Sequence, residues 1–411
     1  MGRAPLAPLR EKPFRIYFAG RLVSTLGGTV APIALAFAVL DLSGSATDLG
    51  LVLAAGVVPQ LLFLLVGGVV ADRLPRGRVL VLGNAVSGLV QAGTAAALLT
   101  GHAPLWLLIA LHAVLGTAGA FLHPAAQGIV PQLVGVAQLH QANALLRVSS
   151  NALRVLGPAV GGVAVALVGP AWAIAWDAAT YLAAAVVLGR LRVPLPPKRS
   201  ADFLADLREG WSEFWSRTWL WAIVLQFSVV NAVWVGGFSL LGPVVADREL
   251  GGAASWGVIG AGLAVGLVAG GVLVVWWRPR RPLLVGTLGV LLDVVPLLAL
   301  AWSDSVVLLT AAAAVAGVGV EVFSVCWSTA LQERVPGDRL SRVSSYDMLF
   351  SFMFMPLGYL LAGPVAERVG TAPTLVACSA VVVVATLAVL LSRDVRTMRG
   401  ATDVAPETAV T

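Results

Sequence analysis

The stretch GGVVADRLPRGRVL (Gly67–Leu80) joins two long apolar segments through a short charged turn. Only 12% of the residues in the chain are charged, yet one acid and three arginines stand within seven positions of this stretch. Apolar residues run up to Ala71, and a new apolar segment begins at Val79. The pattern predicts a tight hairpin between two apolar helices, with these charges in its turn: Asp72, Arg73, Arg76 and Arg78.

The composition of the whole chain matches that of a membrane protein. Of its 411 residues 58% are hydrophobic, and the mean hydropathy is +0.90. A soluble domain carries about 25% charged residues, roughly twice the share found here. The chain is therefore expected to be a polytopic membrane protein that meets the lipid bilayer along most of its length.

Apolar runs of about 20 residues are long enough to cross a hydrocarbon core of about 30 Å as helices. The sequence contains twelve such runs, which predicts an all-α membrane protein with twelve transmembrane helices in two pseudo-symmetric six-helix bundles. The expected spans are 16–40, 49–71, 79–100, 104–126, 143–168, 171–191, 219–244, 254–277, 282–302, 305–330, 342–365 and 371–391.

The basic residues set the orientation of these spans. Most of the 27 Lys and Arg residues fall in segments on the side of the two termini, whereas only Arg248 and Arg368 fall in segments on the opposite side. Cytoplasmic loops carry the excess of Lys and Arg in membrane proteins. Both termini are therefore predicted to be cytoplasmic. The net charge of +6 follows from topology, and nucleic acid is not expected as a partner.

One long polar segment divides the predicted spans six and six. The expected domains are an N-terminal bundle (1–191), a cytoplasmic linker (192–218), a C-terminal bundle (219–392) and a disordered cytoplasmic tail (393–411). Within the linker, Phe203, Leu207 and Trp211 recur at helical spacing, which predicts an amphipathic helix along the inner membrane interface. A helix that docks a partner protein is the alternative interpretation.

The two halves also resemble each other in their glycines. Gly68 and Gly83 are spaced like Gly271 and Gly286, and Leu139, Gly157 and Gly162 are spaced like Leu340, Gly358 and Gly363. Internal repeats of this kind are typical of transporters. The second half has Val275 where the first has Asp72, so any function of Asp72 is expected once per chain.

No sequence signature of an enzyme, a metal site or a cofactor is present, and no phosphate-binding Gly-Lys-Ser/Thr loop that would drive an ATP pump. Ionisable residues at membrane depth are instead the functional candidates. Span 143–168 carries a polar stripe, and three acids lie in later spans. The candidates for proton or substrate coupling are Arg147, Asn151, Arg154, Asp293, Glu321 and Asp347. A static pair with an arginine is the alternative for each acid.

The polar stripe leads into a run that is able to bend. Pro158 removes a backbone donor, and its neighbouring glycines allow bending or close helix approach. A gating hinge is therefore predicted at Gly157, Pro158, Gly161 and Gly162.

These features together resemble the major facilitator superfamily. Gly68-x-x-x-Asp72-Arg73-x-x-Arg76-x-Arg78 is similar to the signature hairpin of that superfamily, and Gly157-Pro158-x-x-Gly161-Gly162 is similar to the motif of its proton-driven exporters, with Leu153 in place of a usual glycine. The opening FRIYFAGRLVSTLGG (14–28), Val335-Pro336 and Pro356-Leu357-Gly358 resemble the branch of drug exporters that includes macrolide and enterobactin efflux proteins. The arginine usual in the fourth span of exporters is missing.

The resemblance implies a secondary active transporter of the bacterial cytoplasmic membrane. It would act as a monomer and export small amphiphilic organic compounds or drugs in exchange for protons by alternating access. The hairpin, Gly68, Asp72, Arg73, Arg76 and Arg78, would act as a conformational lock, with Asp72 meeting the helix start near Ser341–Ser344. The substrate cavity would include Trp234, Phe238, Phe323 and Trp327. An importer or uniporter of a metabolite, and a membrane sensor or assembly partner without transport, are the alternatives.

Overall fold

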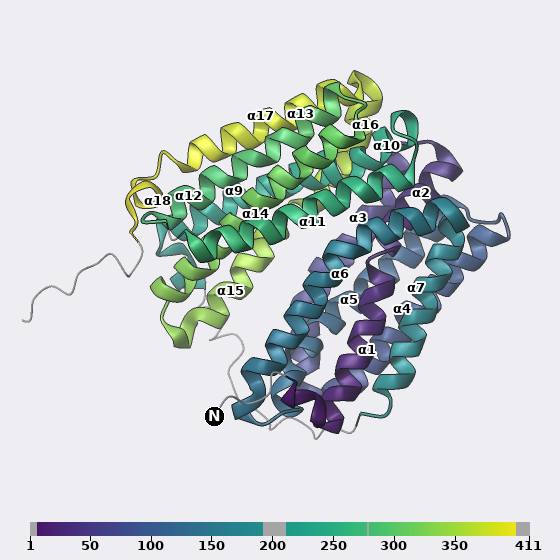
Figure 1. Cartoon of the computed structure of the whole chain (residues 1–411), viewed down its shortest axis with the longest axis horizontal. Coiled ribbons are helices and arrows are strands. Elements are labelled where there is room, and N and C mark those ends of the chain that lie inside the picture. Colours follow the sequence, from purple (N-terminus) through teal and green to yellow (C-terminus); the bar gives the residue numbers. More distant parts are fainter. Residues whose placement is uncertain (1–5, 192–210, 278, 400–411) are drawn as a thin grey trace, which may run out of the picture. The chain divides into compact units, whose positions relative to one another are not determined.

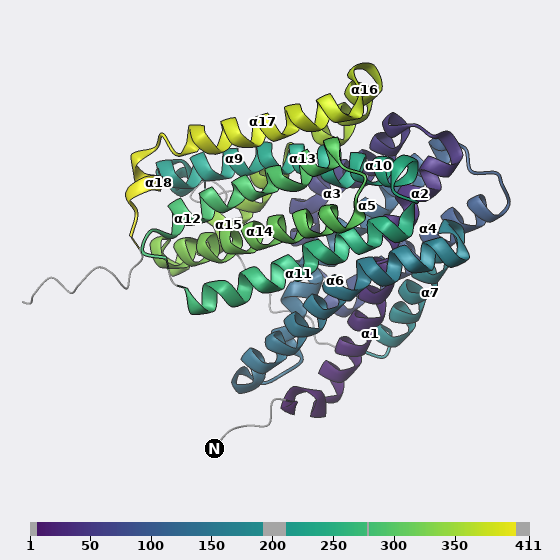
Figure 2. The ribbon, with the colours of Figure 1, turned by 45° about the horizontal axis from the view of Figure 1, so that its top comes forward.

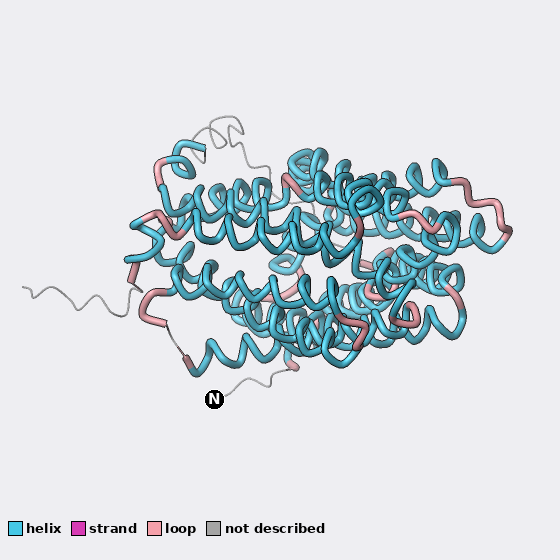
Figure 3. The backbone as a smooth tube through the Cα atoms, turned by 90° about the horizontal axis from the view of Figure 1, so that it is seen from above, coloured by secondary structure: helices cyan, strands magenta, loops and turns pink. Residues whose placement is uncertain are grey.

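The computed structural model describes residues 6–191, 211–277 and 279–399. Over these residues the chain is helical, short loops join the helices, and no strand occurs (Figure 3). Some side chains within the helices lie outside this description: Leu65, Gly68, Val69, Ala71, Asp72, Val136, Gly337, Asp338, Ser341 and Arg342.

The described residues contain 12 helical segments long and apolar enough to cross a membrane. This number confirms the prediction of an all-α membrane protein with twelve spans. The segments are 12–43, 46–64, 76–99, 105–132, 139–168, 170–188, 218–249, 253–276, 282–302, 306–334, 343–369 and 371–389.

The chain divides into two compact units. Unit 1 comprises residues 1–199 and 246–258, and unit 2 comprises residues 200–245 and 259–411. The helices of the first half are α1 (Lys12–Gly28), α2 (Ala31–Ser43), α3 (Ala46–Arg73), α4 (Arg76–Leu99), α5 (Leu105–Ile129), α6 (Leu139–Val168) and α7 (Pro170–Leu188). Within unit 1, α3 packs along α5, and α7 packs along both α1 and α4 (Figure 1).

The second half begins with α9 (Thr218–Trp234), a π-helical turn η4 (Val235–Leu240), α10 (Leu241–Glu249) and α11 (Ala253–Trp276). It continues with α12 (Pro282–Gly289), the 3-10 turn η5 (Val290–Asp293), α13 (Val294–Trp302), α14 (Val306–Arg334), α15 (Gly337–Phe352), α16 (Met355–Val369), α17 (Thr371–Val389) and α18 (Arg393–Thr397). Within unit 2, α17 packs against α9 and α13, which lie beside it in the view of Figure 2.

Several spans are interrupted, where the sequence predicts continuous helices. The first span breaks between α1 and α2 at Thr29 and Val30, and the N–H of Val30 bonds to the carbonyl of Gly27 at 2.9 Å. Pro32, which has no N–H, follows in the first turn of α2. The ninth span changes from α-helix to a 3-10 turn that ends at Asp293. Interruptions of this kind free backbone groups inside a membrane span, and in transporters they occur where irregular backbone is buried or lines a cavity.

The predicted sequence repeat is visible in the helix starts. Gly169 precedes α7 with φ 83° and ψ 160°, and Gly370 precedes α17 with φ 97° and ψ 153°. Residues with a side chain rarely adopt this positive φ, whereas glycine does so at no cost. The two glycines have the same spacing as Leu139 and Leu340, so the duplicated units share this sharp entry into their last helix.

The opening hairpin is tighter than the sequence predicts. Helix α3 continues through Arg73 and α4 begins at Arg76, so that only Leu74 and Pro75 connect them. The carbonyl of Pro75 accepts a bond from the N–H of Arg78 at 2.8 Å. Proline fits such a helix start because its fixed φ suits the entry. The arginines therefore lie on helix ends and not in a loop.

The linker and the tail are described in part. Residues 192–210, the larger part of the predicted amphipathic linker helix, lie outside the described residues, and residues 211–215 are helical. The predicted disordered tail begins with the short helix α18, whose Val395 is buried. Residues 400–411 lie outside the described residues.

Candidate functional site

Each unit contains a cavity of ligand size. The cavity of unit 2 has a volume of about 290 Å³, and that of unit 1 about 320 Å³. Sites for small molecules start at roughly 300 Å³. The two cavities differ in the chemistry of their walls, so they are described separately.

Aromatic rings from two helices form the wall of the unit 2 cavity. Phe227 of α9 stacks on Phe323 of α14 with ring centroids 4.6 Å apart and planes 12° apart. Phe323 also stacks near Trp327, one turn further along α14. Rings at i and i+4 lie on one face of a helix. Met348 and Phe352 of α15 complete an apolar surface, which suits the apolar part of a ligand.

Asp347 is the acid in the lining of this cavity. Its Oδ2 accepts a hydrogen bond from Trp327 Nε1 at 3.0 Å, and its Oδ1 accepts one from Ser351 Oγ at 3.2 Å. These two donors hold the carboxyl against the aromatic wall. The predicted coupling residue Asp347 and the predicted cavity residues Phe323 and Trp327 thus belong to one site.

The other two predicted cavity residues lie elsewhere in unit 2. Trp234 ends α9 and stacks on Phe238 of the π turn η4, with ring centroids 4.5 Å apart. Neither residue lines the cavity that holds Asp347. A role of this second aromatic pair in binding stays a prediction.

The unit 1 cavity is lined by polar side chains of α1, α4, α5 and α7. Arg21 and His123 contribute nitrogen groups, and the hydroxyl and amide groups come from Ser24, Thr25, Asn84, Ser87 and Tyr181. The polar side chains that α4, α5 and α7 contribute to this site were not predicted from the sequence. The signal that would have found it is a polar stripe on α4, where Asn84, Ser87, Gln91 and Thr94 follow one another at helical spacing and are all buried.

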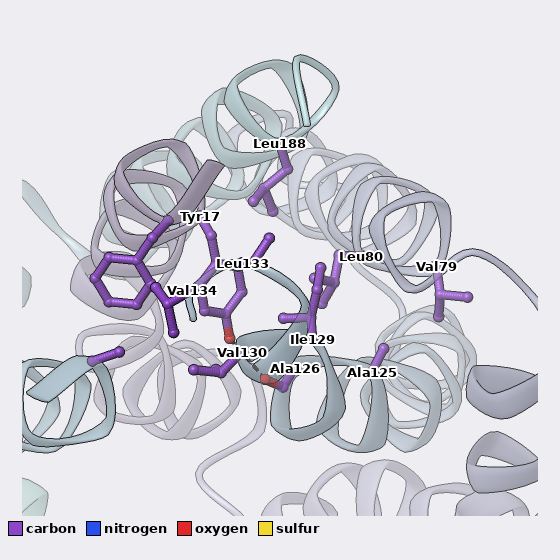
Figure 4. Close-up of a cluster of buried hydrophobic side chains, with 12 residues drawn as sticks. Tyr17, Val79, Leu80, Ala125, Ala126, Ile129, Val130, Leu133, Val134 and Leu188 are labelled. Atoms are coloured by element: carbon purple, nitrogen blue, oxygen red, sulfur yellow. Dashed lines mark hydrogen bonds between the residues drawn. The ribbon is translucent and has the colours of Figure 1, made fainter. Parts of the chain in front are cut away.

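An apolar cluster closes one end of this cavity. Tyr17, Leu80, Ala126 and Leu188 line the cavity and also belong to a buried cluster of 12 side chains (Figure 4). The phenol of Tyr17 points to α5 and donates a hydrogen bond to the carbonyl oxygen of Ala126 at 2.9 Å. One end of the polar cavity is therefore bounded by apolar side chains from α1, α4, α5 and α7.

The predicted lock hairpin contacts α5 through Arg76. The guanidinium of Arg76 donates to the carbonyl oxygen of Gly128, in the last turn of α5. A Cβ atom at Gly128 would lie 2.5 Å from Arg76 Cζ, so a larger residue there would displace the guanidinium from its present position. Arg73 and Arg78 are exposed. The side chain of Asp72 and the surroundings of Gly68 lie outside the described residues, and the lock stays a prediction.

The predicted stripe on the fifth span lies on an exposed face. Arg147, Asn151 and Arg154 are all exposed on α6. The predicted hinge residues sit further along the same helix, which runs without a break through Pro158. Gly157 packs against Thr29, where a Cβ would lie 2.3 Å from that of Thr29, and Gly161 packs against Val30.

The predicted hinge is thus in contact with the break in the first span. This contact is made by Gly157 and Gly161, whereas Gly162 packs against Ala253 and Gly257 of α11. Whether this part of α6 bends during transport stays a prediction.

The remaining predicted acids are separate from the cavity of unit 2. Asp293 is only 3% exposed, and its Oδ1 has no hydrogen-bond partner among the described residues. Glu321 is half-buried, and its side chain packs against Gly270 and Gly271 of α11. Their roles in coupling stay predictions.

Comparisons with known proteins place the chain in a family. A profile of the transmembrane secretion effector family (MFS_3) matches residues 3–409. The chain is 27% identical over 388 residues to the multidrug efflux pump Tap of Mycolicibacterium fortuitum, covering 90% of this chain and 93% of the pump. It is 23% identical to macrolide efflux protein A of Streptococcus pyogenes over 391 residues, covering 90% and 94% of the two chains.

A third relative and two solved structures agree. The enterobactin exporter EntS of Escherichia coli O1:K1 / APEC is 26% identical over 295 residues, which is 70% of each chain. The nucleoside transporter NupG superposes with a TM-score of 0.74 at 13% identity, and the match covers 94% of this chain and 100% of NupG. A bacterial homologue of the lysosomal transporter Spinster superposes with a TM-score of 0.73 at 17% identity, covering 93% and 97%. At these identities the two structures establish the fold alone.

The family match, the efflux-pump relatives and the twelve spans agree with the resemblance drawn from the hairpin. The chain is a multi-pass membrane transporter and not an enzyme. It belongs to the transmembrane secretion effector family of the major facilitator superfamily.

Proposed function

We propose that the protein exports small amphiphilic organic compounds from a bacterial cell in exchange for protons. Export would proceed by alternating access in the cytoplasmic membrane, with a monomer as the working unit and both termini in the cytoplasm. The efflux pumps among its relatives support the direction of transport. The distribution of its Lys and Arg residues supports the orientation.

The observation that carries this proposal is the aromatic cavity of unit 2 with one carboxyl in its wall. Stacked rings of Phe227, Phe323 and Trp327 offer an apolar surface with π faces. Such faces attract cationic groups, and a carboxylate beside them adds an ionic contact. The compounds that fit best are therefore amphiphiles with an aromatic or aliphatic body and a basic amine.

The same carboxyl provides a means of coupling. A proton and the amine of a substrate compete for the oxygens of Asp347, because each binds a carboxylate in a form that excludes the other. Binding of a proton would release the amine, and loss of the proton would let the amine bind. Asp293, Glu321 and the arginines of α6, Arg147 and Arg154, are the further groups proposed to take part, and Asn151 would line their path.

Transport in liposomes tests the function directly. Purified protein in vesicles with an imposed pH gradient is expected to move a lipophilic amine against its concentration gradient, and dissipation of the gradient should stop the movement. Movement driven by a sodium gradient and not by a proton gradient would refute proton coupling. Movement only down the amine's own gradient would favour the importer or uniporter. No movement of any compound would favour a sensor or assembly partner.

A substitution at Asp347 tests the site. Asp347→Asn keeps the shape of the side chain and removes the charge; its amide oxygen can still accept from Trp327 Nε1, and its amide nitrogen can donate to Ser351 Oγ. The affinity for naphthylmethylamine should fall about tenfold, and the affinity for the neutral naphthylmethanol should not change. Asp304→Asn is the matched control, since Asp304 is exposed between α13 and α14. An equal loss for amine and alcohol would assign Asp347 a structural role instead.

A further inference from the structure

The charge of the unit 1 cavity differs from that of the unit 2 cavity. Its lining includes Arg21 and His123 but neither an aspartate nor a glutamate. The cavity therefore has a positive character, whereas the unit 2 cavity carries the carboxyl of Asp347.

Arg21 lies well inside the first span. It stands nine residues after Lys12, the first residue of α1, which corresponds to about 13 Å along a helix axis. A charged side chain at membrane depth is costly to bury, and it usually pairs with an opposite charge or lines a functional cavity. The charge of Arg21 is therefore expected to be stabilised by an anion or by water in the cavity.

The described acids of unit 1 do not supply this counterpart. Arg21 forms no ion pair with a carboxylate of the described residues. Asp177 of α7 accepts a hydrogen bond from Gln91 through Oδ2, and it does not line the cavity. Asp48 lies in the first turn of α3, where its backbone N–H donates to the hydroxyl of the N-cap residue Ser45, and it does not line the cavity. The guanidinium has a hydrogen-bond partner in the phenol of Tyr17, and an arginine has five N–H groups, so the other N–H groups are available to a ligand in the cavity.

Donors beside Arg21 favour an anion as well. These donors are Asn84 and Tyr181, because Ser24 and Thr25 already donate their single hydroxyl protons to the carbonyl oxygen of Arg21, at 3.2 and 2.7 Å. The amide of Asn84 donates one proton to the carbonyl of Leu80 and keeps a second. Asn84 and Tyr181 line the same cavity as Arg21. Guanidinium groups bind carboxylates through two parallel hydrogen bonds, and neutral donors around them complete such a site.

We propose that the unit 1 cavity binds the carboxylate of an amphiphilic organic acid, with Arg21 as the charged contact and with Asn84 and Tyr181 as neutral donors. The apolar part of the acid lies against Leu115 and Leu122 of α5, which line the same cavity. The inference extends the proposed export function, because acids then join amines among the compounds that the protein carries. Binding itself does not depend on transport.

The experiment measures binding to the full-length protein in detergent, without phospholipid and without an ion gradient. The probes are naphthaleneacetate and naphthaleneacetamide, which share a ring system and differ in charge. The wild-type protein should bind the acetate more tightly than the amide. Arg21→Gln should weaken acetate binding by about ten- to a hundredfold and leave amide binding unchanged. Arg190→Gln is the matched control, because Arg190 is exposed after the end of α7, and it should alter neither affinity.

Two further measurements keep the outcome decisive. Retained amide binding and an unchanged melting temperature show that Arg21→Gln folds, and Arg21→Lys should restore part of the acetate preference because it restores the charge. Equal losses for acetate and amide, or a preference that survives in Arg21→Gln, would overturn the proposal. If naphthaleneacetate binds as expected but no compound is transported in liposomes, the export function would be refuted and the binding site would stay established.

Discussion

Gln91 of α4 and Asp177 of α7 are joined by a hydrogen bond of 2.6 Å between Nε2 and Oδ2 in the interior of unit 1. Asp177 is 1% exposed and Gln91 5% exposed. The second carboxyl oxygen, Oδ1, has no partner among the described residues. It faces Gly27, where a Cβ atom would lie 2.4 Å from it. A buried polar pair thus links α4 to α7, and α1 packs over it through a glycine.

The pair is expected to show strong thermodynamic coupling. Gln91→Leu leaves the buried carboxyl without its donor and should destabilise the protein by about 1–3 kcal/mol. Gln91→Leu combined with Asp177→Leu removes both polar groups and should recover part of that loss, since a matched apolar pair needs no donor. Melting temperatures in detergent test this cycle. Additive losses in the double variant would contradict it.

Arg76 is expected to stabilise the end of α5. Arg76→Gln removes the charge that binds the carbonyl of Gly128 and should lower stability by about 1–2 kcal/mol. Arg78→Gln removes an equal charge from an exposed position two residues away and should change stability by less than about 0.5 kcal/mol. Thermal unfolding of the two variants makes the comparison. Equal effects would mean that the charge of the hairpin matters and its contact with α5 does not.

The contact between the segment before α9 and α15 is expected to weaken in acid, because it includes the ion pair of Glu213 with Arg339. Its carboxylate binds Arg217 and also Arg339 of α15, the latter with a distance of 2.7 Å. These hydrogen bonds, first to Arg217 and then to Arg339, lower the pKa of Glu213 from its ordinary value of 4.5. A lowered pKa in the folded state adds stability above the ordinary value, and that stability is lost as the pH falls through the lowered pKa.

The prediction concerns the difference between the wild type and Glu213→Gln. The wild type should melt at a higher temperature at pH 7, by an amount that stays constant down to about pH 5 and shrinks in more acidic buffer. Trp211 and Trp215 pack against each other, and Trp211 packs against Tyr346 of α15, so their fluorescence reports the same transition. A difference that does not depend on pH would mean that Glu213 contributes shape and not charge.

The proposed lock at Asp72 predicts a change in accessibility. Asp72→Asn removes the charge that would meet the start of α15, a contact with an expected strength of about 0.3–2 kcal/mol. Transport should weaken, and cysteines placed at the start of α15 should react faster with a water-soluble reagent because the cytoplasmic side would open more often. Arg73→Gln provides the comparison from the neighbouring exposed residue. Unchanged labelling and transport in Asp72→Asn would reject the lock.

The sequence predicts those features that depend on local composition. Twelve apolar runs become twelve spans, and the repeat noticed at Leu139 and Leu340 reappears in the backbone of Gly169 and Gly370. The polar spacing on the fifth span predicts that Arg147, Asn151 and Arg154 share one helix face, and all three are exposed on α6. Helical periodicity and glycine conformation are local properties, so they can be inferred without a fold.

Features that depend on neighbours in space could not be inferred in the same way. The break at Thr29 and Val30 lies in a run apolar enough to continue as a helix, and Gly157 of α6 packs against it. Asp347 and Trp327 are 20 residues apart on two helices, and only their packing brings them into one cavity. The spacing of the polar residues of α4 is visible in the sequence, but only the structure shows that Asn84 and Ser87 line the same cavity as Arg21.

The apolar cluster around Tyr17 is expected to block the passage of ions at this end of unit 1. A hydrated ion that entered the polar cavity of unit 1 would have to shed its water to pass among the 12 buried side chains beyond Tyr17 and Ala126. Stripping the hydration of an ion costs several kcal/mol or more, which makes such a passage very rare. The cavity can therefore fill with water and solute while this end of the unit carries no ionic current.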